Sequence, residues 1–382
     1  MDSRILDQIL PYFTSNYGNP SSTHSFGMKS RYAIDESRYS IANYLGCTPQ
    51  EIIFTSTGSE SISLALKGTA EYLATINGDF HPENVYFVTS PLEHSAVIKT
   101  ISHLSAWGYK NKIISVDQNG VVNLNILSST LESIKIENPS SQIIVTIQHV
   151  NSEIGVIQDI PKISLIAKEF GAYFHTDAMQ SAKLFDLNVK TLGVDMLTMA
   201  SHKIYGPIGV GILYLKSGSK ISRQTDGGEQ EYNIRAGTQN TPAIVGFGKA
   251  VELLKQERVG RFQHISKLST ILCDKIKFEI PSIRILSENT KIPSINSILF
   301  PQIKSTEFLV RLDLAGIMAS AGSACNSGSI QPTANLKFLG LNDDEIKSVI
   351  RFSIGKNNTE KEINEAAEII VREYQKYIQS KK

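Results

Sequence analysis

The sequence has few cysteines, a single tryptophan and no excess of charge of either sign. Its 382 residues include three cysteines, and 38 basic residues nearly balance 37 acidic ones. An odd number of cysteines without paired spacing excludes a disulfide framework and does not suggest a CxxC metal site. The balanced charge offers no electrostatic argument for binding nucleic acid or an acidic membrane surface.

Long apolar runs are also absent. The longest, such as Ile143-Ile144-Val145, fall far short of the roughly 20 residues that a membrane-spanning helix needs. Residues 1–6 lack the apolar stretch of a secretory signal, and the acidic Asp2 argues against a transit peptide. Together with the unpaired cysteines, these features predict a soluble protein of the reducing cytoplasm.

Between about residues 50 and 215, short β-branched or aromatic runs alternate with longer helical stretches. The predicted strands are 51–54, 85–89, 112–116, 143–147, 172–175, 196–199 and 211–215, and the predicted helices include 59–74, 94–107 and 160–170. This alternation is typical of βαβ units around a largely parallel sheet. We therefore expect an α/β fold.

The pattern changes at Thr241. A long charged amphipathic stretch runs to about residue 277, and an apolar run at 294–300 and a helical tail at 360–378 follow it. Pro242 suits the first turn of the helix at this boundary. We expect a large domain of residues 14–245 and a smaller α+β domain of residues 246–382 together with residues 1–13.

Two polar residues follow predicted strands of the large domain. Lys203 lies in Ser201-His202-Lys203-Ile204-Tyr205-Gly206-Pro207, and Asp177 lies in Phe174-His175-Thr176-Asp177-Ala178-Met179-Gln180. Taken singly, a surface lysine and a helix-capping aspartate are the ordinary interpretations. Together they match pyridoxal phosphate, which binds a lysine as a Schiff base and needs a carboxylate on its ring nitrogen.

Two turns of small polar residues are further candidates. In Phe54-Thr55-Ser56-Thr57-Gly58-Ser59-Glu60-Ser61, a hydroxyl-rich turn before a helix is suited to a phosphate, although helix capping by Thr57 and Glu60 explains it equally well. Cys325 lies in Ala321-Gly322-Ser323-Ala324-Cys325-Asn326-Ser327-Gly328-Ser329, where we expect an exposed nucleophilic thiol. Cys47 and Cys273 have apolar or helical neighbours and are predicted to be buried and inert.

These segments together resemble the cysteine desulfurases of the aminotransferase class V family, nearly from end to end. The resemblance also includes Gly18-Asn19-Pro20-Ser21-Ser22-Thr23-His24, Leu92-Glu93-His94-Ser95-Ala96-Val97, His149-Val150-Asn151-Ser152-Glu153-Ile154-Gly155, Arg235-Ala236-Gly237-Thr238 and Ile350-Arg351-Phe352-Ser353. It implies the fold-type I, aspartate aminotransferase-like architecture of pyridoxal-phosphate enzymes, with a mostly parallel sheet in the large domain and a smaller α+β C-terminal domain.

The resemblance implies a role for each matching residue. Lys203 resembles the lysine that binds pyridoxal 5'-phosphate, Asp177 the partner of its ring nitrogen, and His94 the histidine that stacks on the ring and transfers protons. Arg351 resembles the arginine that holds the substrate carboxylate, a role suited to a bidentate guanidinium. The remaining matches are Gly58, Ser59, Ser201 and His202 at the phosphate, Thr238 reaching the phosphate across a homodimer, Gln180 with Asn151 or Ser152 at the phenolic oxygen, and Cys325 as the persulfide-forming cysteine.

Three departures from the family pattern stand out. Ser152 replaces an asparagine that contacts the phenolic oxygen, so either the contact is lost, a water fills it, or Asn151 substitutes. Ala321 replaces a serine of the cysteine loop. A strand and an Ala-Thr-Thr-Pro loop that normally precede the segment matching residues 4–12 are not found, so either the true start lies upstream or the protein lacks that loop.

The expected function is conversion of L-cysteine to L-alanine with a persulfide on Cys325. The persulfide sulfur would pass to an iron–sulfur scaffold or another acceptor protein, and transient iron–sulfur ligation by Cys325 stays open. The alternatives are another class V reaction, such as transamination or selenocysteine lysis, and an impaired paralogue that acts as a non-catalytic dimeric partner in sulfur transfer. Cys325 distinguishes among the enzymes, because a transaminase has no use for a thiol there.

Overall fold

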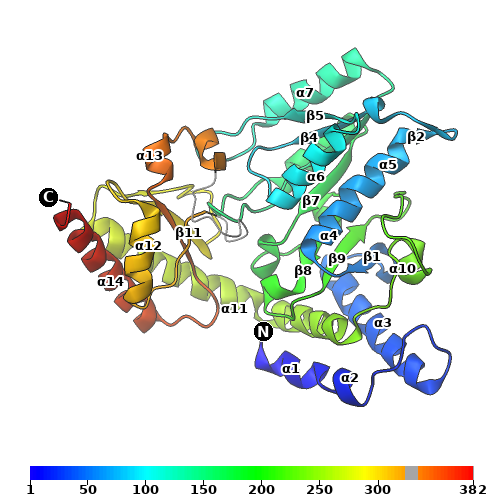
Figure 1. The fold of residues 1–382 in the computed structure, drawn as a ribbon, viewed down its shortest axis with the longest axis horizontal. Helices are drawn as coiled ribbons and strands as arrows, with labels where there is room; N and C mark the ends of the chain where they lie inside the picture. The colour runs from blue at the N-terminus through cyan, green and yellow to red at the C-terminus, as the bar shows by residue number, and fades with distance from the viewer. Residues whose placement is uncertain (323–333, 382) are drawn as a thin grey trace. The chain divides into compact units, whose positions relative to one another are not determined.

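The computed structural model describes residues 1–322 and 334–381, and the chain divides into two compact units (Figure 1). Unit 1 consists of residues 1–114, 124–149 and 159–258, and unit 2 of residues 115–123, 150–158 and 259–382. Residues 1–13 and 246–258 thus lie in unit 1, whereas the sequence placed them in the small domain. The N–H of Asp2 donates to the carbonyl of Tyr205, and helix α11 (Thr241–Glu279) continues past residue 245 without a break.

Unit 1 is built on a seven-stranded sheet. Its strands, in spatial order, are β1 (Ile52–Thr55), β9 (Gly211–Leu215), β8 (Met196–Ala200), β7 (Tyr173–Asp177), β6 (Gln142–Thr146), β4 (Val85–Thr89) and β5 (Lys110–Ile113). The strands from β8 to β5 are parallel, and β9 pairs antiparallel with both β1 and β8. The predicted α/β fold is confirmed, with the strand predicted at 112–116 beginning two residues earlier.

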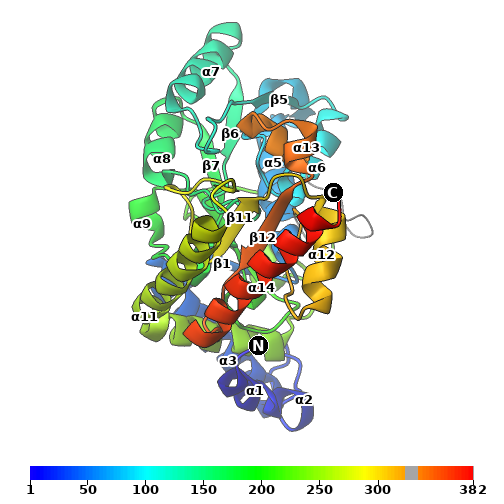
Figure 2. The ribbon, with the colours of Figure 1, turned by 90° about the vertical axis from the view of Figure 1, so that its left-hand side faces the viewer.

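Helices cover both faces of this sheet. The helices α4 (Gly58–Ser63), α5 (Thr69–Ala74) and α6 (Ser95–Ser105) lie on one face, and α7 (Leu124–Glu137) and α8 (Ile160–Glu169) lie on the other (Figures 1 and 2). A π-helical turn at Leu64–Gly68 joins α4 to α5, so the predicted helix at 59–74 is continuous. Every residue of β4 and of β8 is buried, which explains why these strands have continuous apolar runs without polar alternation.

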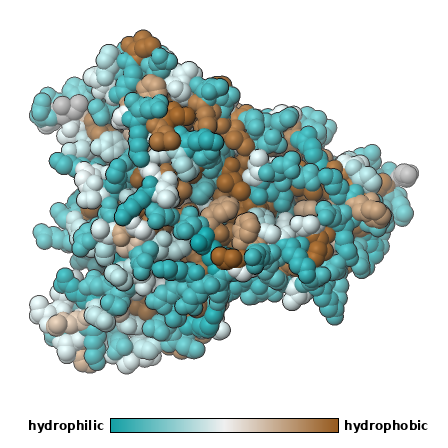
Figure 3. Space-filling model, turned by 180° about the vertical axis from the view of Figure 1, so that it is seen from behind, coloured by the Kyte–Doolittle hydropathy of each residue, from teal (hydrophilic) through white to brown (hydrophobic). Residues whose placement is uncertain are grey.

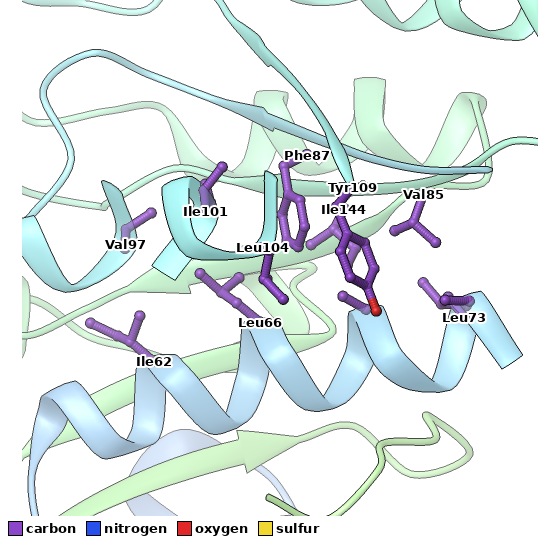
Figure 4. Close-up of a cluster of buried hydrophobic side chains, with 12 residues drawn as sticks. Ile62, Leu66, Leu73, Val85, Phe87, Val97, Ile101, Leu104, Tyr109 and Ile144 are labelled. Carbon is purple, nitrogen blue, oxygen red and sulfur yellow. The ribbon is translucent and has the colours of Figure 1, made fainter. Parts of the chain in front are cut away.

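An apolar cluster joins α4, α5 and α6 to the sheet (Figure 4). Figure 4 shows Leu66 from the π-helical turn, Leu104 from α6 and Phe87 from β4 pointing toward one another. Phe87 and Leu66 are completely buried. Burying side chains of this size contributes about 1.5–3 kcal/mol each, so this cluster holds the three helices on the sheet.

A row of hydrogen bonds crosses the middle of the sheet. The hydroxyl of Thr89 donates to the carbonyl of Thr146, and the Thr146 hydroxyl lies 2.8 Å from Nδ1 of His175. On its other side, Nε2 of His175 lies 3.2 Å from the hydroxyl of Thr198. Burial lowers the pKa of His175 to about 3, so its ring is neutral and has both a donor and an acceptor nitrogen for these partners.

A buried ion pair fixes the segment before the predicted phosphate residue Thr238. The guanidinium of Arg38 in α3 (Ser25–Leu45) makes two hydrogen bonds, of 2.7 and 2.8 Å, with the carboxylate of Glu231. Glu231 also accepts the N–H of Phe54. Glu231 is the first of three consecutive residues with left-handed backbone, at φ of 48°, 56° and 62°. This conformation is energetically unfavourable for residues other than glycine. The ion pair therefore stabilises an otherwise unfavourable turn.

Unit 2 has a three-stranded antiparallel sheet of β10 (Arg284–Ile285), β11 (Ile295–Leu299) and β12 (Val349–Ser353). Helices α12 (Ser305–Leu314) and α14 (Glu360–Gln379) and the C-terminal part of α11 flank the sheet (Figure 2). Thr359 and Glu362 form a capping box that begins α14. The apolar run at 294–300 contains β11, and the helix predicted at 360–378 is confirmed.

Hydrophilic side chains cover most of the face that Figure 3 shows, with apolar groups among them. In the part of the chain that the structure describes, no helix combines the length and the apolar character needed to cross a membrane.

We predict that Phe87→Ala lowers the free energy of unfolding by about 3–5 kcal/mol, because it opens a cavity in a close-packed cluster. The matched control Phe278→Ala removes the same ring from a site that is 82% exposed and should change stability by less than about 0.5 kcal/mol. Urea unfolding followed by circular dichroism measures both. Equal effects of the two substitutions would contradict the core assignment.

Candidate active site

The predicted site residues of unit 1 gather at the carboxyl ends of its parallel strands. Asp177 ends β7, and it pairs in register with Thr198 of the neighbouring strand β8. A 3-10 turn at Ser201–Ile204 follows β8 directly and carries Lys203. Because neighbouring parallel strands end at the same edge, Asp177 and Lys203 lie near each other, where ligands of α/β folds bind.

The carboxyl group of Asp177 is buried, with 6% of the residue exposed. Burial dominates and raises its pKa above the ordinary value, while the N–H of Met179, which donates to Oδ1 at 2.9 Å, opposes this rise. His94 and Lys203 also oppose the rise through their charges. The three side chains are thus electrostatic neighbours, and the carboxylate favours a cation in this place.

His94 is the N-cap of α6, and its half-buried ring is held by the helix itself. Its Nδ1 accepts the N–H of Ala96 at 3.1 Å. This hydrogen bond assigns the proton of a neutral ring to Nε2. His94 therefore presents one defined nitrogen for proton transfer.

Ser201 and Gly58 are placed as a phosphate site requires. The hydroxyl of Ser201 is buried and has no hydrogen-bond partner among the described residues. Gly58 is buried where any Cβ would come within 2.4 Å of the Met179 side chain, which follows Asp177. Ser59 and His202, also predicted at the phosphate, are exposed at the starts of α4 and of the turn at Ser201–Ile204, respectively.

The start of α4 decides the capping question left by the sequence. Thr57 is the N-cap, because its hydroxyl accepts the N–H of Glu60 at 3.0 Å. The Glu60 carboxylate does not return to Thr57; it accepts the N–H of Ser56 at 2.8 Å and pairs with Arg235 at 2.8 Å. Capping therefore occupies Thr57 and leaves Gly58 and Ser59 out of these bonds.

Unit 1 also contains Thr238 and Gln180, and Gln180 follows the end of β7 by three residues. Thr238 is exposed and lines a cavity of about 230 Å³ together with Ser56 and Arg235. The side-chain oxygen of Gln180 accepts a hydrogen bond from Lys183 at 3.0 Å.

Three predicted residues, Asn151, Ser152 and Arg351, belong to unit 2, where they are joined. Nη1 of Arg351, in β12, donates to the carbonyl of Ser152 at 2.8 Å. The side-chain oxygen of Asn151 accepts the N–H groups of Glu153 and Ile154, both at 2.8 Å, and so closes a turn. That oxygen is committed to the backbone. The predicted nucleophile, Cys325, lies outside the described residues.

Sequence reasoning missed Glu93 and the ion pair of Glu60 with Arg235. Glu93 is 2% exposed and accepts hydrogen bonds from Ser90 and Gln148. Its position after the apolar Pro91-Leu92 pair could have suggested a buried carboxyl group, and a buried carboxyl group needs hydrogen-bond partners.

Of the other two cysteines, Cys273 is buried as predicted, whereas Cys47 is only half-buried. The thiol of Cys273 lies 3.3 Å from the side-chain oxygen of Asn296. Burial raises the pKa of the half-buried Cys47 to about 12, so its thiol stays protonated and unreactive.

Comparison with known proteins agrees with this arrangement. The family model described as aminotransferase class-V matches residues 1–365. The chain is 38% identical over 373 residues to the putative cysteine desulfurase IscS 1 of Bacillus subtilis, covering 96% of this chain and 94% of that protein.

Solved structures are similar over the same range. A NifS-like protein superposes with a TM-score of 0.88 at 30% identity and covers 97% of this chain and 95% of its own. A structure described as SspA in complex with cysteine superposes with a TM-score of 0.80 at 30% identity, over 94% of this chain and 97% of that one. The predicted resemblance is confirmed, and the chain belongs to the aminotransferase class-V family.

Proposed function

We propose that this protein is a pyridoxal-phosphate-dependent cysteine desulfurase. It converts L-cysteine to L-alanine and transfers the sulfur atom to the Cys325 thiol as a persulfide. The observation that carries the proposal is the buried Asp177 carboxylate at the end of β7, with the charges of Lys203, after β8, and of His94, before α6, acting on it. Similarity to proteins named cysteine desulfurases over nearly the whole chain supports the choice of reaction within the family.

The residues of unit 1 fit pyridoxal phosphate. The unpartnered hydroxyl of Ser201 offers a buried donor for a phosphate oxygen, and Gly58, which has no side chain, would let a phosphate approach the backbone at the start of α4. The Asp177 carboxylate would hold a protonated ring nitrogen, and Lys203 would bind the cofactor covalently. When bound, pyridoxal phosphate supplies a cationic ring that accepts electrons from the substrate α-carbon.

The remaining chemistry falls to side chains of the protein. The amine of Lys203 would remove the α-proton, and Nε2 of His94 would move a proton to or from the reacting groups. The guanidinium of Arg351 would bind the substrate carboxylate through two parallel hydrogen bonds. Cys325 must be a thiolate when it receives the sulfur. His94 is our candidate for its base, a role in which the ring must release the N–H of Ala96, because Nε2 carries the proton while Nδ1 accepts that bond.

We also propose that the protein works as a homodimer. Large side chains are exposed on α2 (Pro11–Thr14) and α3, and a second copy would cover them. They are Phe13, Met28, Tyr32 and Tyr39. Thr238, exposed in the segment after Glu231, would reach the phosphate of the partner. The reduced state of Cys47 and Cys273 suits the cytoplasm, and an iron–sulfur scaffold or another protein would accept the persulfide sulfur.

We predict that Ser201→Ala weakens pyridoxal phosphate binding by about 10- to 100-fold, because it removes a hydrogen bond to a charged group. Stability without cofactor should not fall, since the hydroxyl has no partner to lose. The control Ser164→Ala removes a buried hydroxyl that donates to Gly193, so it should lower stability by about 1 kcal/mol and leave affinity unchanged. Spectrophotometric titration of the cofactor-free protein measures affinity, and an unchanged affinity in Ser201→Ala would rule out this phosphate contact.

We predict that Cys325→Ser lowers alanine and sulfide production from L-cysteine by about 100-fold or more, because a hydroxyl is a poor nucleophile and cannot carry persulfide sulfur. Visible absorbance of the bound cofactor should persist. The control Cys47→Ser should keep the parent rate. If Cys325→Ser forms alanine as fast as the parent, the reaction is another of the class V reactions; if the parent binds no cofactor, the protein is a non-catalytic partner.

A further inference from the structure

A second buried carboxyl group lies in the same region as Asp177. Glu93 directly precedes His94 in the turn between β4 and α6, and only 2% of the residue is exposed. The proposed reaction uses Asp177 and His94 but assigns nothing to Glu93. A carboxyl group that is buried this deeply needs either a compensating charge or a proton.

Hydrogen bonds join Glu93 to the segment that follows β6. Its Oε1 lies 2.6 Å from the hydroxyl of Ser90, and the backbone N–H of Gln148 donates to Oε2 at 2.9 Å. In return, the side-chain amide of Gln148 donates to the carbonyl of Leu92. The turn that carries His94 is thus tied to Gln148 in both directions.

The tie continues to Asp177. The residue after Gln148 is His149, and its N–H donates to the carbonyl of Asp177 at 2.9 Å. Glu93 therefore stands in a chain of hydrogen bonds that runs from the turn bearing His94 to the strand end bearing Asp177. A change at Glu93 would displace both groups relative to each other.

Charge decides which of the two carboxyl groups is ionised. The titratable groups on the joined elements are His94 beside Glu93, His149 after β6, and His175 and Asp177 on β7. Asp177 has the charges of His94 and Lys203 to offset its burial. For Glu93, burial raises the pKa to about 8, and the negative charge of Asp177 adds to this effect. Burial raises the pKa of both carboxyl groups, so two negative charges side by side are unfavourable, and Asp177, with His94 and Lys203 beside it, is the better placed of the two to stay ionised.

We propose that Glu93 is a positioning residue that works as a neutral carboxylic acid: it holds the His94 turn against the Asp177 strand end and leaves Asp177 as the single negative charge there. The inference rests on the proposed function for its catalytic meaning. In the structure the Ser90 hydroxyl donates to Oε1; the neutral acid would reverse this bond and donate its proton to the Ser90 oxygen, while its other oxygen keeps the N–H of Gln148. A glutamine side chain offers the same donor and acceptor without a proton to lose.

The first test needs no cofactor and no activity. The unfolding equilibrium of the cofactor-free parent and of Glu93→Gln is measured by urea denaturation from pH 5 to 8. In this range the folded parent keeps a proton that the unfolded chain releases, so its stability relative to the variant falls as pH rises, by about tenfold per pH unit in the unfolding constant. Glu132→Gln, at an exposed site on α7, should follow the parent. A constant ratio between Glu93→Gln and the parent overturns the proposal.

The second test uses the enzyme loaded with pyridoxal phosphate. Glu93→Gln should form alanine from L-cysteine within about threefold of the parent rate at pH 7. It should lack any loss of rate that ionisation of Glu93 causes in the parent above pH 8. Glu93→Ala should fall by about tenfold or more, since the tie to Gln148 is lost.

If Glu93→Gln is as impaired as Glu93→Ala, or cannot be folded at any pH, a charged carboxylate is required and the inference is overturned. A parent that makes no alanine would overturn the proposed function instead, while the unfolding measurement would still decide the protonation of Glu93.

Discussion

A carboxylate buried at the end of a parallel strand is the constraint around which unit 1 is organised. Removing one ion from water costs several kcal/mol, so Asp177 persists only because the fold supplies compensation. The N–H of Met179, the charge of Lys203 and the charge of His94 all act on it. The cationic ring of the proposed cofactor would complete this compensation. The same low dielectric leaves no place for a second negative charge.

The topology of the sheet brings the groups that compensate the charge of Asp177 close to it. Parallel strands joined by helices present their carboxyl ends at one edge, so residues separated by long stretches of chain meet there. Gly58, His94, Asp177 and Lys203 each follow or end a strand of this sheet. Gly58 begins α4 and His94 caps α6, whereas Asp177 ends β7 and Lys203 lies in the turn that follows β8. The positions of these residues thus follow from the backbone architecture.

Much of this could be predicted from residue patterns, because strands buried on both faces have continuous apolar runs and polar residues mark their ends. Relations between distant segments could not. The carboxylate of Glu231 accepts the N–H of Phe54, 177 residues away, and nothing local indicates this pairing. Glu60 fits a capping pattern but bonds Ser56 and Arg235. Glu93 shows no periodic signal at all. Residues 115–123 and 150–158 join unit 2 through contacts that depend on the completed fold.

The hydrogen-bonded row from Thr89 through Thr146 and His175 to Thr198 has a consequence for folding. Hydrophobic burial alone does not determine the register of strands that are apolar on both faces, because a shift of one residue along a neighbouring strand would still bury aliphatic groups. The row of polar groups distinguishes the native register from the shifted ones. In a misaligned strand, a histidine ring or a hydroxyl would be buried without a hydrogen-bond partner, at a cost of about 1–3 kcal/mol for each unpaired group. The row therefore favours the native register of the four strands during folding, independently of any ligand.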